Sequence, residues 1–426
     1  MLIILRQTWA LFLGIAILML AHGLQGTLLG LRANIEGFPD VATGVVMSGY
    51  YVGLLVGSLR VPILVNRVGH VRVFAALLSL GSTAILFQAI FVEPVAWFLM
   101  RFLTGYCFAG AFIVAESWLN GSASNDQRGL ILSLYMVVQL GSMAAGQFLL
   151  NLADPRGFDL FILVSVLISV AAVPMLLTAV AAPTVTSSRA LSLRTLYRLS
   201  PLGVVGLIGT GVGTSGLFSL APVYANQEGL SVAAISTFMA AMTLGGVAFQ
   251  LPVGRLSDRL DRRKVIAAVT MLAALALLPP VLLPQIPNVM LYPGFFLVGG
   301  LCLPVYALCV AHTNDFLNSE QMVGASSALV LAFGIGAAAG PTLTALSMQF
   351  LGAMGFPVFL ALTHLLIGLF AIWRMTRRAP VPMTDRGAYI SLPTPTPVVI
   401  PMAQEKAVAR SPTPAAPTPP ALADAG

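Results

Sequence analysis

The sequence predicts an all-α membrane protein with twelve transmembrane helices in two pseudo-symmetric bundles of six, and three observations predict it. First, 58% of the 426 residues are hydrophobic and only 9% are charged, with a mean hydropathy of +0.92. A soluble domain carries about 25% charged residues, so this chain cannot cover a globule with polar surface. Second, twelve apolar runs are each long enough to cross a bilayer. Third, similar charged blocks follow corresponding runs in the two halves, as an internal duplication would leave them.

The twelve expected helices follow one another with short connections, as in a compact bundle. They cover roughly residues 9–32, 43–65, 71–92, 95–118, 129–151, 158–181, 201–225, 232–253, 265–284, 291–312, 325–350 and 357–374. The expected domains are a first bundle over residues 1–182, a cytoplasmic linker over 183–200 and a second bundle over 201–376. Residues 377–426 are rich in Pro, Thr and Ala, cannot bury apolar surface, and are expected to form a disordered cytoplasmic tail.

The distribution of basic residues predicts the orientation. If the N-terminus is cytoplasmic, all of the 22 Lys and Arg lie on or near the inside except Arg32, Arg156 and Arg101. Under the positive-inside rule, both termini therefore lie in the cytoplasm, and the chain is a multi-pass protein of the inner membrane. Membrane topology also explains the net charge of +7, so no nucleic-acid partner is expected. The first apolar run is longer than a signal-peptide core and is expected to be retained.

The sequence argues against an enzyme. The three cysteines, Cys107, Cys302 and Cys309, lie inside apolar segments and lack metal-ligand spacing. The aqueous segments contain no nucleophile–base set and no Gly-rich phosphate loop. We therefore expect no metal, no cofactor and no catalytic residue.

The two charged blocks are candidate gates. In the second block, Gly254 allows close helix approach, Asp258 can accept hydrogen bonds from a helix N-terminus, and the arginines can pair with acids or carbonyls. Such contacts would fasten the cytoplasmic side, whereas a basic loop that merely obeys topology is the simpler alternative. The candidate gating residues are Arg60, Asn66, Arg67, Gly69, Arg72, Gly254, Asp258, Arg259, Arg262 and Arg263.

Arg101 and Glu116 share the fourth expected helix. An arginine inside hydrocarbon costs at least about 2.5–3.5 kcal/mol, so Arg101 is expected either to hold an anionic group, to tune a proton-carrying neighbour, or to snorkel to the outer end. Glu116 lies 15 residues further on, nearer the inner mouth. Two roles stay open for Glu116: a structural ion pair with Arg60, or a protonatable carrier site.

Other polar groups lie within the expected helices. His22 and Gln25 are three residues apart and share one helix face, and a histidine there would suit proton coupling or be a satisfied structural group. Further candidates for the cavity are Tyr135, Gln139, Thr210, Thr214, Ser215, Ser219 and Tyr306.

The block from Gly254 to Arg263 resembles the Gly-x-Leu-x-Asp-Arg-x-x-Arg-Arg pattern of the major facilitator superfamily, and Arg101 with Gly105 resembles its Arg-x-x-x-Gly element. The first block departs from the pattern, with Asn66 where Asp is usual and Pro62 where Gly is usual. The stretches that begin at Arg67, Arg101, Glu116 and Arg128 are similar to the YcaD-like branch, whose members are generally described only as transporters. The resemblance implies the major facilitator fold, with helices one, four, seven and ten lining a central cavity.

These patterns predict a secondary active transporter that moves a small organic solute by alternating access, coupled to protons. Arg101 and His22 are the chargeable groups expected in the cavity, so a neutral or anionic solute is expected. The expected partners are the solute, protons and membrane lipid, and the chain is expected to be a monomer. Efflux of hydrophobic drugs is the closest alternative. A transporter-like membrane sensor or scaffold, with the Pro-rich tail as its docking element, is the alternative from another class.

Overall fold

The structure is a computed structural model that describes residues 2–121, 128–177, 191–282, 288–383, 386, 387 and 389. Every regular element in this part of the chain is a helix. Residues 183–190 of the expected linker and residues 390–426 of the expected tail lie outside the described residues, so the expected disorder of that part of the tail is not tested.

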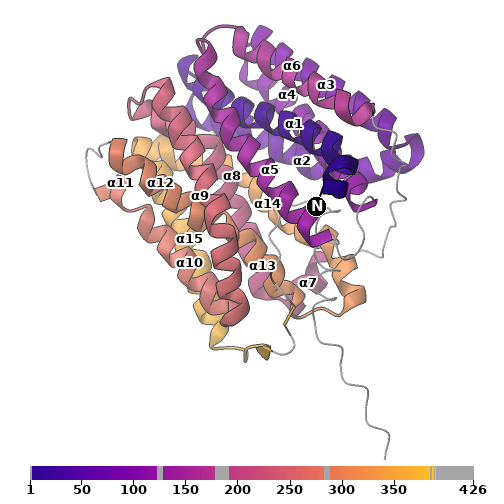
Figure 1. Cartoon of the computed structure of the whole chain (residues 1–426). Helices are drawn as coiled ribbons and strands as arrows, with labels where there is room; N and C mark the ends of the chain where they lie inside the picture. The colour runs from indigo at the N-terminus through magenta and orange to yellow at the C-terminus, as the bar shows by residue number, and fades with distance from the viewer. Residues whose placement is uncertain are drawn as a thin grey trace, which may run out of the picture.

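The helices fall into two halves, which occupy opposite sides of the molecule in Figure 1. The first half consists of α1 (Leu2–Ile35), α2 (Asp40–Val68), α3 (His70–Ile90), α4 (Pro94–Gly121), α5 (Arg128–Phe148), η1 (Leu149–Leu152) and α6 (Asp159–Leu176). The short helix α7 (Leu193–Leu199) precedes the second half. The second half consists of α8 (Pro201–Gln227), α9 (Val232–Arg259), α10 (Arg262–Ala276), α11 (Pro279–Leu282), α12 (Asn288–Cys302), α13 (Pro304–Asn314), α14 (Ser319–Leu351), η2 (Gly352–Met354) and α15 (Gly355–Met375).

The expected membrane crossings are consistent with these helices. Eleven helical stretches of the described chain are long and apolar enough to span a bilayer, and the last, Gly324–Met375, is 52 residues long. That stretch contains both α14 and α15, which are separated at Gly352, where φ is +63°. A bilayer crossing needs about 20 residues, so this stretch holds two crossings, in agreement with twelve in total. The expected helix over 291–312 is divided into α12 and α13 at Pro304, which lacks a backbone N–H donor.

Glycines allow the helices of one half to touch through their backbones. A Cβ atom at Gly53 of α2 would collide with the carbonyl oxygen of Phe102 in α4, and one at Gly105 of α4 would collide with that of Tyr50 in α2. In the second half, Gly245 of α9 and Gly299 of α12 make the corresponding close approach. In lipid, helix association depends on such close packing because no hydrophobic force drives the helices together.

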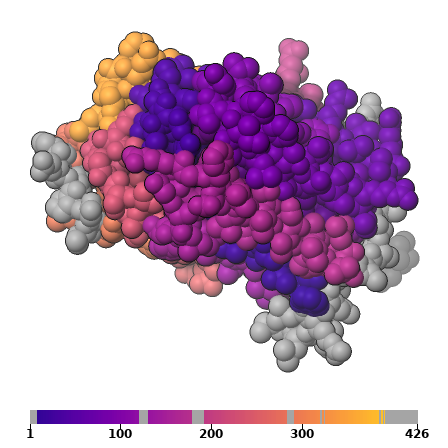
Figure 2. All heavy atoms as spheres, turned by 90° about the horizontal axis from the view of Figure 1, so that it is seen from above, coloured from indigo at the N-terminus to yellow at the C-terminus, as the bar shows by residue number. Residues whose placement is uncertain are grey.

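The two halves join at one end of the bundle, which we call the junction end. Four hydrogen bonds between side chains link the halves in the described chain. They pair Asn34 with Asn226, Asp40 with Gln227, Ser48 with Thr342, and Asn151 with Ser236. Three of these pairs lie where α1, α2, α8, α9 and η1 begin or end. Seen from above in Figure 2, the first half covers most of the visible face and the second half lies directly beside it.

The opposite end of the bundle carries the two charged blocks, at the α2–α3 and α9–α10 connections, and we call it the basic end. Of the hydrogen bonds found between the two halves in the described residues, none lies at this end. The described hydrogen bonds that fasten the halves together therefore lie toward the junction end.

The backbone contact between α2 and α4 generates a stability prediction. Gly105→Ala forces α2 and α4 apart and should lower the free energy of unfolding by about 1–3 kcal/mol. Gly141→Ala in α5 is the matched control, because nothing lies within 4 Å of its added Cβ. Thermal unfolding in detergent, followed by intrinsic fluorescence, measures both. Equal melting temperatures for the two variants would contradict the packing described here.

Candidate functional site

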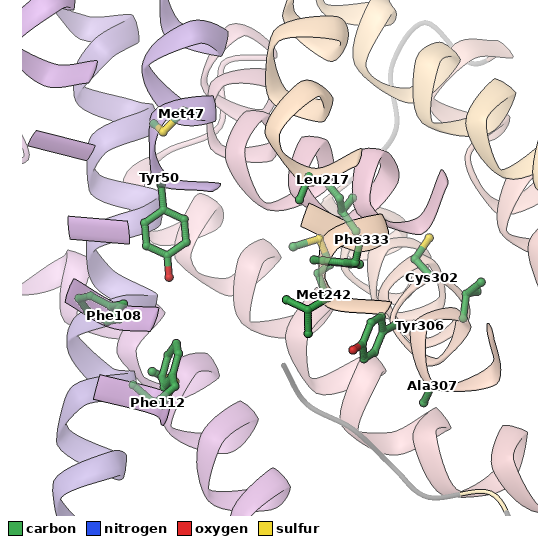
Figure 3. Packing of buried hydrophobic residues seen from close by; sticks show 14 of the residues in the cluster. Met47, Tyr50, Phe108, Phe112, Leu217, Met242, Cys302, Tyr306, Ala307 and Phe333 are labelled. Carbon is green, nitrogen blue, oxygen red and sulfur yellow. The ribbon is translucent and has the colours of Figure 1, made fainter. Parts of the chain in front are cut away.

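A cavity of about 160 Å³ lies between the two halves. Residues of α1, α2, α4 and α5 line it from the first half, and residues of α8, α9, α13 and α14 line it from the second. Figure 3 shows Tyr50 and Phe112 on one side of this space, facing Phe333 and Tyr306 on the other. A cavity of this volume holds on the order of ten water molecules. The site is thus built by both halves and changes shape whenever one half moves against the other.

Most of the cavity wall is apolar. Methionine, phenylalanine and leucine side chains supply this surface, namely Met19, Met47, Leu54, Phe112, Leu140, Met143, Phe218, Met239, Leu303 and Phe333. Methionine is flexible and polarizable, so such a wall adapts to solutes of different shape. Polar side chains are interspersed among them, including Thr27, Gln147 and Gln250.

Arg101 is the one charged side chain among the described residues that line the cavity. It is only 4% exposed, and its guanidinium carbon lies 4.6 Å from the ring centre of Tyr50. Its Nε atom is buried without a hydrogen-bond partner. The Tyr50 ring in turn lies 5.4 Å from the ring of His22. A cation–π contact offsets only part of the cost of burying a guanidinium, so the site favours an added negative charge.

Glu116 lies behind the cavity wall in a hydrogen-bonded chain. The Tyr135 hydroxyl donates to Glu116 Oε1 at 2.8 Å, and Gln139 Nε2 donates to the Tyr135 hydroxyl at 3.0 Å. Glu116 is 1% exposed, and Gln139 lines the cavity. Tyr306 of the second half also lines the cavity, close enough for the charge of Glu116 to act on it. A buried acid is thus connected to the cavity by two hydrogen bonds.

The structure distributes the sequence-predicted polar residues between the cavity and the surrounding core. His22, Arg101, Gln139, Thr214, Ser219 and Tyr306 line the cavity. Gln25, Glu116, Tyr135, Thr210 and Ser215 are buried outside its lining. Arg60, which could have paired with Glu116, is exposed near the basic end of α2, and no Arg60–Glu116 ion pair forms in the described chain.

Sequence reasoning missed several lining residues. Tyr50 and Tyr51 line the cavity together with Arg101, and Ser219 of the second half lines it as well. Thr27 and Gln147 also line the cavity and hydrogen-bond to each other. The helical spacing of Gln139, Met143 and Gln147 in α5 places them on one face, and this pattern was the available signal.

The second charged block is tightly connected at the basic end. The buried Arg262 donates to Asp315 Oδ1 at 2.6 Å, to Asp258 Oδ1 at 3.2 Å and to the Ala311 carbonyl at 2.8 Å. Arg263 pairs with Asp261 at 2.7 Å. These bonds tie the α9–α10 connection to the end of α13.

The pKa values of two acids at the basic end, Asp315 and Asp261, are shifted in opposite directions. Burial raises the pKa of Asp315 to about 6, and the charges of Arg262 and Arg386 only partly offset this. Partial burial of Asp261 would also raise its pKa, but the hydrogen bonds from the side chain and backbone of Arg263 outweigh it and lower the pKa below the usual value. The Asp261 carboxylate therefore stays ionised, whereas Asp315 can take up a proton near pH 6.

The first charged block lacks comparable contacts. Asn66, Arg67 and Arg72 are all exposed, and Gly69 adopts a φ of +96° between α2 and α3. Pro62 lies inside α2 and is partly buried. In this conformation the two blocks are therefore unequal, with two buried arginines paired with acids in one and exposed side chains in the other.

Two helical bundles that enclose a cavity between them and join at one end define a membrane transporter fold. The family model described as Major Facilitator Superfamily matches residues 11–249 and 205–394, so the chain belongs to this family. The uncharacterized MFS-type transporter YcaD of Escherichia fergusonii is 28% identical over 349 residues, which are 81% of this chain and 89% of that protein. These matches identify the chain as a transporter, in agreement with the expectation that it is not an enzyme.

Solved structures confirm the fold. The nucleoside transporter NupG superposes with a TM-score of 0.70 at 13% identity, over 87% of this chain and 99% of that one. A bacterial homolog of the human lysosomal transporter Spinster, in an inward-facing and unoccupied conformation, gives a TM-score of 0.68 at 12% identity, over 96% and 98% of the two chains.

The inequality of the two blocks predicts unequal mutational effects. Asp258→Asn weakens the bond from Arg262, whereas Asn66→Ala removes an exposed side chain. Since a hydrogen bond to a charged group contributes about 1.5–3 kcal/mol, Asp258→Asn should reduce transport several-fold and Asn66→Ala much less. Transport by proteoliposomes, normalised to the amount of reconstituted protein, measures the difference. Equal and small losses would remove any special role for the second block.

Proposed function

We propose that this chain is a secondary active transporter that moves a small organic solute, neutral or anionic, across the inner membrane by alternating access coupled to protons. The observation that carries the proposal is the cavity lined by both halves, with Arg101 as its charged group. Both termini and both charged blocks lie in the cytoplasm in this proposal, as the distribution of basic residues favours.

The arrangement of contacts between the halves supports alternating access. The described hydrogen bonds between halves lie toward the junction end, which is the extracytoplasmic end in the proposed orientation. In this proposal the structure represents the state that is open to the cytoplasm. Rocking the halves about the cavity would break these bonds and bring the two charged blocks toward the opposite half.

Glu116 is the proposed proton-binding residue. It is the one acid buried inside a membrane-spanning helix of the described chain, and it reaches the cavity through Tyr135 and Gln139. Acids inside membrane helices are expensive and commonly mark proton pathways. Protonation of Glu116 would remove its charge and weaken the hydrogen bond from the Tyr135 hydroxyl. Because Gln139 is bonded to that hydroxyl, Gln139 would then reorient at the cavity wall. Proton binding and solute binding would be coupled in this way.

The apolar cavity wall also supports a second candidate function, the efflux of hydrophobic drugs. Phenylalanine and methionine side chains from both halves could hold a large apolar solute. A drug pump would bind lipophilic cations as readily as anions. Comparing solutes of opposite charge in flux assays therefore separates the two functions.

The proton site is tested by Glu116→Gln in proteoliposomes that contain a pH-sensitive dye. Solutes that stabilise the purified chain against heating are added with and without an imposed pH gradient. Wild type should accumulate solute faster with the gradient, and Glu116→Gln should transport at the rate without a gradient, because its side chain cannot release a proton. Glu93→Gln is the matched control, since Glu93 is exposed just before α4. Gradient-driven transport by Glu116→Gln would refute this role.

A further inference from the structure

The charge of the cavity narrows the class of cargo. Its described lining contains one cation, Arg101, and no Asp or Glu. An unpaired buried charge is costly, and the buried Nε atom of Arg101 has no acceptor. A carboxylate entering the cavity would supply both the counter-charge and the missing acceptor. A cation would meet repulsion there, and a second negative charge would stay uncompensated.

Zwitterions fit the lining poorly as well. The ammonium group of an amino acid needs an anionic partner, and Glu116 is not part of the lining but is hydrogen-bonded behind the wall to Tyr135. The apolar side chains of Met143, Phe218 and Phe333 instead present surface for a hydrocarbon body. Tyr50, whose ring contacts Arg101, and His22 beside it also line the cavity and can donate further hydrogen bonds to an oxyanion.

We propose that the cargo is an organic monocarboxylate with an apolar body, held by its carboxylate at Arg101. This inference rests on the proposed transport function and narrows its cargo to one charge class. Arg101 selects the charge through the fork of its guanidinium, and the Met- and Phe-rich wall accepts bodies of different shape.

The test measures ligand-induced thermal stabilisation of the purified full chain in detergent. The probes are butyrate, octanoate and phenylpropionate, each compared with its amide and its amine analogue, together with phenylalanine. At least one carboxylate should raise the melting temperature, while its amide, its amine and phenylalanine should not. Arg101→Gln should weaken carboxylate binding roughly ten- to hundredfold, since a charge-assisted bond is lost. Arg101→Lys should keep the preference for anions with lower affinity, and Arg156→Gln, at an exposed site, should behave as wild type.

The outcomes separate this inference from the proposed function. The proposed cargo class is overturned if amines stabilise the chain as much as carboxylates do, or if no carboxylate stabilises it. Either result holds even if proton-coupled transport of another solute is intact. Conversely, selective carboxylate binding with no proton dependence of transport leaves the cargo class standing and refutes the coupling.

A second inference comes from the segment that follows α15. Its described residues are 376–383, 386, 387 and 389, and they lie at the basic end, at the bottom of Figure 1. The backbone N–H of Tyr389 donates to Asp258 Oδ1 at 2.8 Å, and the Gly387 carbonyl accepts from Arg262. The Tyr389 ring lies directly on Gly254, where an added Cβ would collide with it. The absence of a side chain at Gly254 therefore makes room for the chain's own C-terminal segment.

Further contacts hold this segment in place. Arg386 donates to the Leu260 carbonyl at 2.7 Å, and Arg263 donates to the Arg378 carbonyl at 2.6 Å. Arg378 donates to the Leu199 carbonyl at 2.9 Å and stacks over the ring of Phe316. The segment thus bridges α7, the α9–α10 connection and the end of α13. We call its described residues from 378 to 389 the strap.

We infer that the strap is an autoinhibitory element that favours the state with separated basic ends. Asp258 and Gly254 belong to the block that is expected to face the opposite half when the basic end closes, and the strap occupies both. Closing would require the strap to leave or to be displaced. At the corresponding positions of the first half, Asn66 is exposed and Pro62 is partly buried.

Spin labels on Leu130→Cys and Leu256→Cys test this inference by pulsed dipolar measurements in nanodiscs. Both leucines are exposed, near the basic ends of α5 and α9, and the native cysteines are buried. Removing residues 379–426, or introducing Tyr389→Ala, should raise the population with a short label distance about fivefold, the effect of losing one ordinary contact. Removing residues 391–426 keeps every described strap contact and is the control.

Gly254→Ala provides an independent variant, because it displaces the Tyr389 ring while the C-terminal segment stays complete. It should shift the distances in the same direction as Tyr389→Ala. Identical distance distributions in the full chain and in all strap variants would overturn the inference. A shift produced equally by removal of residues 391–426 would also overturn it, since the strap itself would then not be responsible.

Discussion

The absence of water inside the bilayer is the constraint on which this structure depends. Backbone groups that face lipid must bond within their own helix, and every regular element of the described chain is a helix. Polar side chains must find partners inside the protein or line a cavity. Glycines at the contact of α2 with α4 let the backbones touch, and this close packing holds Tyr50 and Arg101 in position at the cavity. The helical scaffold and the placement of polar groups at the cavity therefore both follow from the absence of water inside the bilayer.

The two halves share a fold, yet their charges are arranged differently. The first half carries Arg101 and Glu116, the chargeable residues closest to the cavity apart from His22. The second half contributes mainly hydroxyl and apolar groups to the cavity, and its charges gather at the basic end around Arg262. In the proposed mechanism this division separates two tasks: the first half binds charged groups, and the second half controls access through its connections and the strap.

Several features of the site were predictable from residue chemistry and helical period. An arginine in a hydrocarbon segment must serve a purpose, and Arg101 indeed lines the cavity. The partner of Glu116 was not predictable in the same way. The sequence left Arg60 and a carrier role open, and the structure pairs Glu116 with Tyr135 of the adjacent helix. Helix rotation decides such pairs, and rotation depends on packing with several neighbours, which no single segment encodes.

The sequence by itself determined the membrane environment, the helices and their duplicated order, because hydropathy and length act locally along the chain. The sequence also singled out Gly254 and Asp258 as part of a charged block between two apolar runs. Only the tertiary structure decided that the halves join at one end, that Tyr50 and Thr27 line the cavity, and that Tyr389 covers Gly254. These features arise from contacts between residues that are far apart in the chain, so their geometry depends on the packing of all helices together.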